Sequence, residues 1–167
     1  MRPFARAILC AGLPPALFLA ERGLARLGAP PVDLFLVASA LAALRASPRS
    51  AIAVALALGA VRDLFSAEPV LLHSIVNVSF AAAISRVRDS IYFGSGLARA
   101  LVVAAVSLLA AITADVLARR GLVAAEPALA IGIFAAGAAL AAFLSVPLGW
   151  VVAPLLGVRP QRFGRAW

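Results

Sequence analysis

Residues 55–77 read ALALGAVRDLFSAEPVLLHSIVN, and they place charged side chains between two apolar runs. Arg62 and Asp63 stand here, together with His73, the single histidine of the chain. A charged side chain at the centre of a bilayer costs about 2.5–3.5 kcal/mol, so we expect these groups near the ends of membrane spans. The stretch therefore predicts two membrane helices joined by a tight turn at FSAEPV, with Pro69 beginning the second helix.

The composition is that of an integral membrane protein. Hydrophobic residues make up 64% of the 167 residues, charged residues make up 13%, and the mean hydropathy is +1.06. Soluble domains carry about 45–50% apolar residues and about 25% charged residues. A chain of this length has room for about five or six spans of about 20 residues, and we expect no soluble catalytic domain beside them.

Charges and prolines interrupt the apolar runs and predict one all-α membrane domain over residues 1–167. The predicted spans are about 4–20, 32–45, 50–65, 70–86, 98–118 and 127–156. The second, third and fourth spans are shorter than the bilayer is thick. We therefore expect loop residues to cap them, or neighbouring helices to bury them away from lipid.

The first apolar run has two interpretations. Arg2 and Arg6 before it are compatible with a secretory signal. Pro14-Pro15 inside the run, and the lack of a small-x-small cleavage pattern after it, favour a retained first span.

The distribution of arginine predicts that both termini are cytoplasmic. All 15 basic residues are arginine, and with the N-terminus inside, ten fall on the cytoplasmic side and five on the other. The excess of basic residues in short loops marks the cytoplasmic side. The ten are Arg2, Arg6, Arg45, Arg49, Arg86, Arg88, Arg99, Arg159, Arg162 and Arg165, and the five are Arg22, Arg26, Arg62, Arg119 and Arg120.

The net charge and the numbers of cysteine and histidine residues disfavour several function classes. The formal charge of +8 is explained by the basic loops of a membrane protein, so we do not expect a nucleic-acid partner. One cysteine, Cys10, excludes an intrachain disulfide. One cysteine and one histidine lack the spacing of a metal site, and no nucleophile–base set is evident, so we predict no metal, cofactor or enzymatic activity.

Polar residues at the predicted outer ends of the spans form a candidate site. Asp63 is placed to accept hydrogen bonds from His73 or from backbone N–H groups at the start of the next helix. Arg62 points elsewhere, toward lipid phosphate or toward Asp115. Ordinary interfacial pairing and a partner-binding patch both remain open. The candidate residues are Asp33, Arg62, Asp63, Ser66, His73 and Asp115.

Small residues four apart in the last predicted span indicate a second candidate surface. Gly137, Ala141 and Ser145 share one helical face, and small residues allow two membrane helices to approach closely. We therefore predict a helix-packing face there.

Three stretches together resemble the rod shape-determining protein MreD family: PPVDLFLVASALAAL, LGAVRDLFS and LLHSIVN. The family shows a glycine four residues before an aspartate, in the pattern G-x-x-x-D-h-h-S, and here these residues are Gly59, Asp63 and Ser66. The stretches VSLLAAITADVL and SVPLGWVVAPLLGVRPQRF resemble the fifth and last spans of the family. The stretch EPVLLHSIV departs from the family pattern, with valine and leucine in place of leucine and glycine.

The resemblance implies a fold and a role. It implies six helices similar to the substrate-binding subunits of energy-coupling-factor transporters, and a non-enzymatic scaffold of the bacterial inner membrane. The expected partners are an MreC-like single-span protein, a RodA-type glycosyltransferase, a class B penicillin-binding transpeptidase and membrane lipids. These proteins form the elongasome, the machinery that inserts lateral peptidoglycan and determines rod shape.

Two other functions remain open at this point. The shared fold makes a small-molecule (vitamin) binding subunit of an energy-coupling-factor-type transporter the main alternative. A lipid-handling enzyme or flippase is the third, although it would require a charged central cavity, whereas the charges here fall at span ends. Fold similarity alone does not decide among them.

Overall fold

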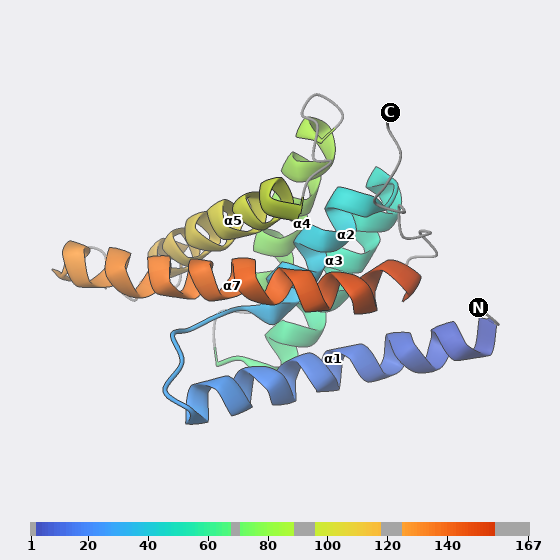
Figure 1. The fold of residues 1–167 in the computed structure, drawn as a ribbon, viewed down its shortest axis with the longest axis horizontal. Helices are drawn as coiled ribbons and strands as arrows, with labels where there is room; N and C mark the ends of the chain where they lie inside the picture. The colour runs from blue at the N-terminus through green and yellow to red at the C-terminus, as the bar shows by residue number, and fades with distance from the viewer. Residues whose placement is uncertain (1–2, 68–70, 89–95, 118–124, 156–167) are drawn as a thin grey trace.

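The structure, a computed structural model, describes residues 3–67, 71–88, 96–117 and 125–155, with side chains described for all of these except 3–10 and 154–155. All regular structure in these residues is α-helical, as the sequence predicted (Figure 1). The helices are α1 (Pro3–Arg26), α2 (Leu34–Arg45), α3 (Pro48–Phe65), α4 (Leu72–Val87), α5 (Gly96–Leu117) and α7 (Pro127–Leu155). Pro69, Arg2, Arg119, Arg120, Arg159, Arg162 and Arg165 of the predicted turns and tail lie outside the described residues.

Helix α2 is the centre of the molecule. Its ten residues from Leu34 to Ala43 are all buried, and the helix contacts α1, α3, α4, α5 and α7. A helix of 12 residues is about 18 Å long, well short of the roughly 30 Å of a hydrocarbon core. The expectation that this short apolar run lies among neighbouring helices is therefore confirmed.

Two antiparallel pairs surround α2. Helices α3 and α4 pack along each other, and so do α5 and α7. In Figure 1, α5 and α7 run side by side and extend beyond the other helices at the left of the view, while α1 lies along the bottom, below α7. Phe35, Val37 and Leu41 of α2 and Val103 of α5 are among the largest fully buried side chains.

Helix α1 extends further than the predicted span 4–20, and a glycine ends it. Gly28 has a φ of +72°, in the left-handed region that glycine adopts without strain. The Gly28 N donates to Ala25 O at 3.1 Å, and Ala29 N donates to Leu24 O at 3.0 Å. This pair of bonds is the Schellman motif, which satisfies the last carbonyls of a helix. Pro30 follows, and it directs the chain toward α2.

Close backbone contact joins α7 to the start of α2. A Cβ atom added to Gly137 would overlap the Pro31 carbonyl oxygen. Ala141, one turn later, is fully buried, and Ser145 is buried as well. The predicted packing face Gly137–Ala141–Ser145 is therefore buried inside the chain, and at Gly137 it lies against the backbone just before α2.

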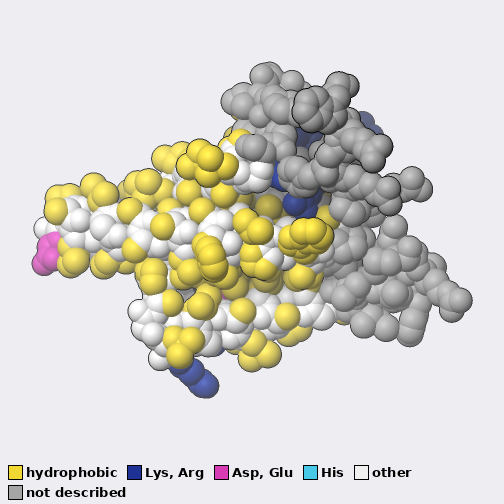
Figure 2. Space-filling view, in the orientation of Figure 1, with side chains coloured by type: hydrophobic (Ala, Val, Ile, Leu, Met, Phe, Trp, Pro, Cys, Tyr) yellow, Lys and Arg dark blue, Asp and Glu magenta, His cyan; other side chains and the backbone are white. Residues whose placement is uncertain are grey.

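Large apolar side chains cover much of the exterior. On α7, Phe143 is 74% exposed and Trp150 is 75% exposed, and Figure 2 shows hydrophobic side chains over most of the described face of α5 and α7. Among the described helices, α5 and the segment Pro127–Ala153 of α7 are long and apolar enough to cross a membrane. Length and composition thus support two spans, whereas α2 and α4 are shorter apolar helices.

Candidate functional site

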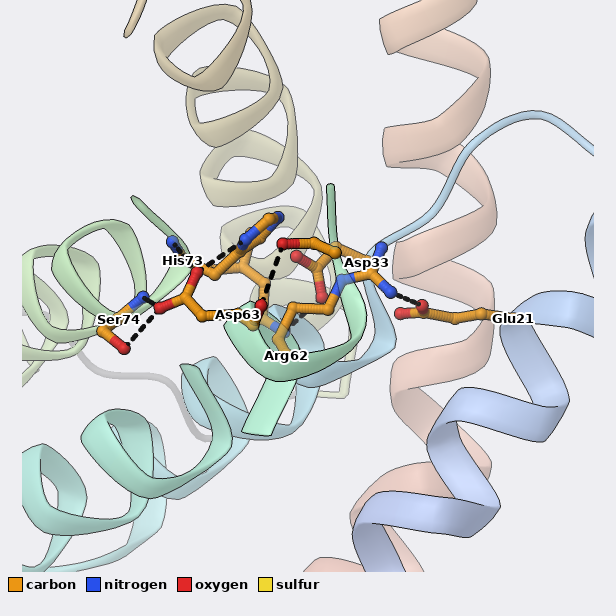
Figure 3. A network of polar contacts seen from close by, with 8 residues as sticks. Glu21, Asp33, Arg62, Asp63, His73 and Ser74 are labelled. Atoms are coloured by element: carbon orange, nitrogen blue, oxygen red, sulfur yellow. Dashed lines mark hydrogen bonds and ion pairs between the residues drawn. The ribbon is translucent and has the colours of Figure 1, made fainter. Parts of the chain in front are cut away.

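Residues near the C-terminal ends of α1 and α3 lie close to the first turns of α2 and α4 (Figure 3). Charged and polar side chains from these four helix ends gather there, in a cluster that we call the polar network. Its members are Glu21, Asp33, Arg62, Asp63, His73 and Ser74.

Asp63, in the last turn of α3, caps the N-terminus of α4. Its Oδ1 accepts hydrogen bonds from the backbone N of His73 at 2.9 Å and from His73 Nδ1 at 3.0 Å. Its Oδ2 accepts from the backbone N of Ser74 at 3.1 Å and from the Ser74 hydroxyl at 2.7 Å. Backbone N–H groups in the first turn of a helix have no partner within the helix. The predicted contacts of Asp63 with His73 and with the start of the next helix are therefore confirmed.

The residue before α4 explains why this cap comes from another helix. Leu71 stands at the N-cap position, where its side chain makes no capping hydrogen bond. Ser, Thr, Asp or Asn normally provides the acceptor at this position. Leu71 also has a φ of 69°, a left-handed conformation that is strained for leucine. Asp63 supplies the missing acceptor, so the packing of α3 on α4 also completes the first turn of α4.

Gly59, one turn before Asp63, makes this approach possible. A Cβ atom on Gly59 would stand 2.5 Å from Ser74 Cα and 2.9 Å from His73 O, closer than real Cβ atoms approach backbone. Only glycine fits without moving one helix. The Gly59-x-x-x-Asp63 spacing thus places an open surface and a carboxylate on the same face of α3.

Glu21, near the end of α1, accepts a hydrogen bond from the first turn of α2, as Asp63 does from the first turn of α4. Its Oε1 accepts a hydrogen bond from Leu34 N at 2.7 Å, and its Oε2 lies 2.6 Å from Arg62 NH1. The Glu21 side chain is only 8% exposed. Asp33, the N-cap residue of α2, accepts from Leu36 N at 2.9 Å. Two carboxylates therefore face the N-terminus of α2, where the helix dipole favours negative charge.

Arg62 connects α3 to α1, and this corrects one prediction. Its partner is Glu21, not Asp115. Asp115 is buried near the end of α5, a helix that packs against α7 and α4, whereas Arg62 projects from α3 toward α1. The Arg62 guanidinium lies 5.7 Å from the centre of the Phe35 ring, a distance at which the cation is attracted to the ring.

The opposite end of α2 is also held by charged side chains. Arg88, directly after α4, donates from NH1 to Ala43 O at 3.1 Å and to Ala46 O. Arg45, the last residue of α2, donates from NH1 to Gly149 O of α7. Carboxylates at the N-terminus and arginines at the C-terminus match the helix dipole, so both ends of the short central helix have charged partners.

A cavity of about 320 Å³ lies beside the polar network. It is lined by the end of α1, the connection from α1 to α2, the end of α3 and the start of α4. The polar side chains in its wall are Glu21, Arg22, Arg62, Ser66 and His73. Ligand pockets commonly have volumes of about 300–1,000 Å³, so this cavity is at the lower end of that range.

The structure brings together most of the candidate residues that the sequence identified. Asp33, Arg62, Asp63 and His73 lie in the polar network, and the Ser66 hydroxyl donates to the Asp63 backbone oxygen at 3.4 Å. Sequence reasoning did not include Glu21. The signal for it was present, because Glu21 stands four residues after the buried Leu17 and therefore continues the inward face of α1.

The chemistry of these side chains is that of hydrogen-bonded helix capping. In the described residues, no group of three or more His, Cys, Asp or Glu side chains has an arrangement that can hold a metal ion. The Asp63 and Glu21 carboxylates already accept backbone and side-chain hydrogen bonds from neighbouring helices. Comparison of the chain with protein-family models, with curated proteins and with solved structures found no match.

Proposed function

We propose that this chain is a non-enzymatic scaffold of a bacterial inner membrane that acts in rod-shape determination and lateral peptidoglycan synthesis. The observation that carries the proposal concerns the residues of the MreD-like pattern. Gly59, Asp63 and Ser66 all act at one joint between α3 and α4. A pattern whose members serve helix packing and capping fits a protein that holds partners in a fixed arrangement.

The proposed membrane location rests on the surface and on the sequence. Exposed apolar side chains cover α5 and α7, and these two helices are long enough to cross a bilayer. The short central helix α2 has its polar ends closed by charged side chains, as an apolar surrounding requires. With the arginine distribution, we infer a multi-pass protein with cytoplasmic N- and C-termini.

The proposed partners are an MreC-like single-span protein and, through it, a RodA-type glycosyltransferase and a class B penicillin-binding transpeptidase. The face Gly137–Ala141–Ser145 is occupied by other helices of this chain. A partner helix therefore docks on another surface, and the exposed apolar sides of α5 and α7 are available for it.

One observation favours a second candidate function. The cavity of about 320 Å³ has charged side chains in its wall and lies between helix ends. A binding subunit of an energy-coupling-factor-type transporter needs a cavity with polar groups for a small molecule. Among the described residues of the wall, the aromatic ring side chains are Phe65 and His73 and the others are charged, small or aliphatic, so a vitamin with a large ring would find little surface for stacking.

Depletion of the protein in its rod-shaped host separates these functions. The scaffold proposal predicts round, swollen cells with less lateral wall insertion, and recovery of an MreC-like protein when the chain is purified in mild detergent. Rods of normal shape with a defect in vitamin uptake would instead support the transporter subunit.

A further inference from the structure

The cavity beside the polar network holds an arginine with unused hydrogen-bond donors. Arg62 gives one terminal nitrogen to Glu21, and Figure 3 shows its other terminal nitrogen pointing away from that carboxylate. Its Nε is buried without a hydrogen-bond partner among the described residues. A guanidinium has five donors in a fixed planar fork, so most of the capacity of Arg62 is not used within the chain.

Glu21 orients Arg62, and the carboxylates around Arg62 are held by hydrogen bonds from neighbouring helices. Both oxygens of Glu21 are engaged, by Leu34 N and by Arg62. Asp33 accepts from Leu36 N, and the Asp63 carboxylate accepts from His73 and Ser74; neither aspartate lines the cavity.

Among the described residues, the charged side chains in the wall are Arg22, Arg62 and Glu21, a formal charge of +1 with His73 neutral. A wall with this excess of arginine favours an anion over a cation. The planar fork of arginine matches the oxygens of a phosphate or carboxylate group.

Exposed apolar side chains occur in the cavity wall and close to it along the chain, and Phe65, in the wall, is 52% exposed. Leu27, after α1, is 84% exposed, Leu64, near the end of α3, is 82% exposed, and Leu71, before α4, is 54% exposed. Each is next to, or two residues from, a residue of the cavity wall. A soluble anion has no apolar part to cover these side chains. An amphiphile has one, because its charged head can enter the cavity while its chain covers the leucines.

We propose that this cavity binds the phosphate headgroup of a membrane phospholipid, with Arg62 and Arg22 as the phosphate-binding residues. Glu21 is a positioning residue, because it holds Arg62 in place and does not face the phosphate with a free oxygen. This inference rests on the proposed membrane location, and it does not depend on the proposed scaffold role.

Lipid retention measured by native mass spectrometry tests the site. The full chain, purified in detergent, is mixed with dioleoyl phosphatidylglycerol, with dioleoylglycerol, which lacks the phosphate, or with inorganic phosphate. We expect the wild type to retain phosphatidylglycerol but not dioleoylglycerol. We expect Arg62→Gln to weaken retention about tenfold or more and Arg22→Gln to weaken it several-fold, because each loses a charged hydrogen-bond donor.

Arg49→Gln is the matched control, since Arg49 is an exposed arginine in the first turn of the same helix as Arg62, at its other end. It should retain the lipid as the wild type does. Arg22→Gln keeps the test valid if Arg62→Gln disturbs folding, because Arg22 is exposed and its described contact is with the Phe18 ring at 5.2 Å.

Three outcomes would overturn the proposal. The first is equal retention by the wild type, Arg62→Gln and Arg22→Gln. The second is equal binding of dioleoylglycerol, which would indicate an apolar surface alone. The third is displacement of the lipid by equimolar inorganic phosphate, which would identify a soluble anion as the ligand. A chain that binds lipid in this way but whose depletion leaves rod shape unchanged would contradict only the scaffold proposal.

Discussion

Gly59 and Ser74 lie so close that a Cβ atom on Gly59 would stand 2.5 Å from the Cα of Ser74. The same Ser74 donates its backbone N–H and its hydroxyl to Asp63, one helical turn after Gly59. Close approach and capping are thus two parts of one joint between α3 and α4. The joint accounts for charged residues between two apolar runs, since the first turn of α4 needs an acceptor that Leu71 does not supply.

Gly59→Ala should destabilise the protein because the added methyl group meets backbone, which cannot rotate away. Overpacking of this kind costs about 1–3 kcal/mol. Gly132→Ala in α7 is the control, because a Cβ atom there meets nothing within 4 Å and alanine favours a helix. Thermal unfolding in detergent should show a lower Tm for Gly59→Ala and an equal or higher Tm for Gly132→Ala. Equal Tm values for Gly59→Ala and the wild type would refute the close approach.

Replacement of Glu21 should test the link between α1 and α2. Glu21→Ala removes the acceptor of Leu34 N and the partner of Arg62, whereas Glu21→Gln removes the charge and keeps one acceptor oxygen. Loss of a buried acceptor costs about 1–3 kcal/mol, so Glu21→Ala should be the less stable variant. A double-mutant cycle with Arg62→Gln measures the coupling between the two side chains. Strictly additive effects would mean that the ion pair contributes nothing.

The contact between α7 and α2 gives a third prediction. Ala141→Leu should lower stability by about 1–3 kcal/mol, because Ala141 is fully buried on the packed side of α7. Ala139→Leu, on the exposed side of the same helix, should have little effect. Urea or thermal unfolding compares the two. If Ala139→Leu is the more harmful variant, then α7 faces the other way.

Orientation in the membrane can be measured with single cysteines in a Cys10→Ser background. Ala67 and Ala125 are exposed and lie on the predicted outer side, whereas Ser50, at the start of α3, is exposed on the predicted cytoplasmic side. A membrane-impermeant thiol reagent should label cysteines at 67 and 125 in intact spheroplasts, but not at 50. Labelling at position 50 alone would reverse the orientation inferred from the arginines.

The helices could be predicted from the sequence because charges, prolines and glycines interrupt the apolar runs at their ends. The contact of Asp63 with His73 could be predicted because the two residues are only ten apart in the sequence and stand near facing helix ends. The partner of Arg62 could not, since it depends on where α1 lies, and Glu21 is far from Arg62 along the chain. Spacing identified Gly137 as a packing residue, but nothing in the sequence identified Pro31 as its neighbour.

The central claim is that Asp63 acts as a structural cap for α4 and not as a partner-binding residue, and Asp63→Ala tests it most directly. Tm in detergent and recovery of rod shape in depleted cells are measured together for Asp63→Ala and Asp63→Asn. Asp63→Ala leaves donors of His73 and Ser74 unsatisfied, so we expect a loss of about 1–3 kcal/mol and weak recovery of shape. Asp63→Asn keeps one acceptor oxygen and should lose less in both. An Asp63→Ala protein as stable as the wild type that still fails to restore rod shape would contradict the structural account and identify a partner-binding site.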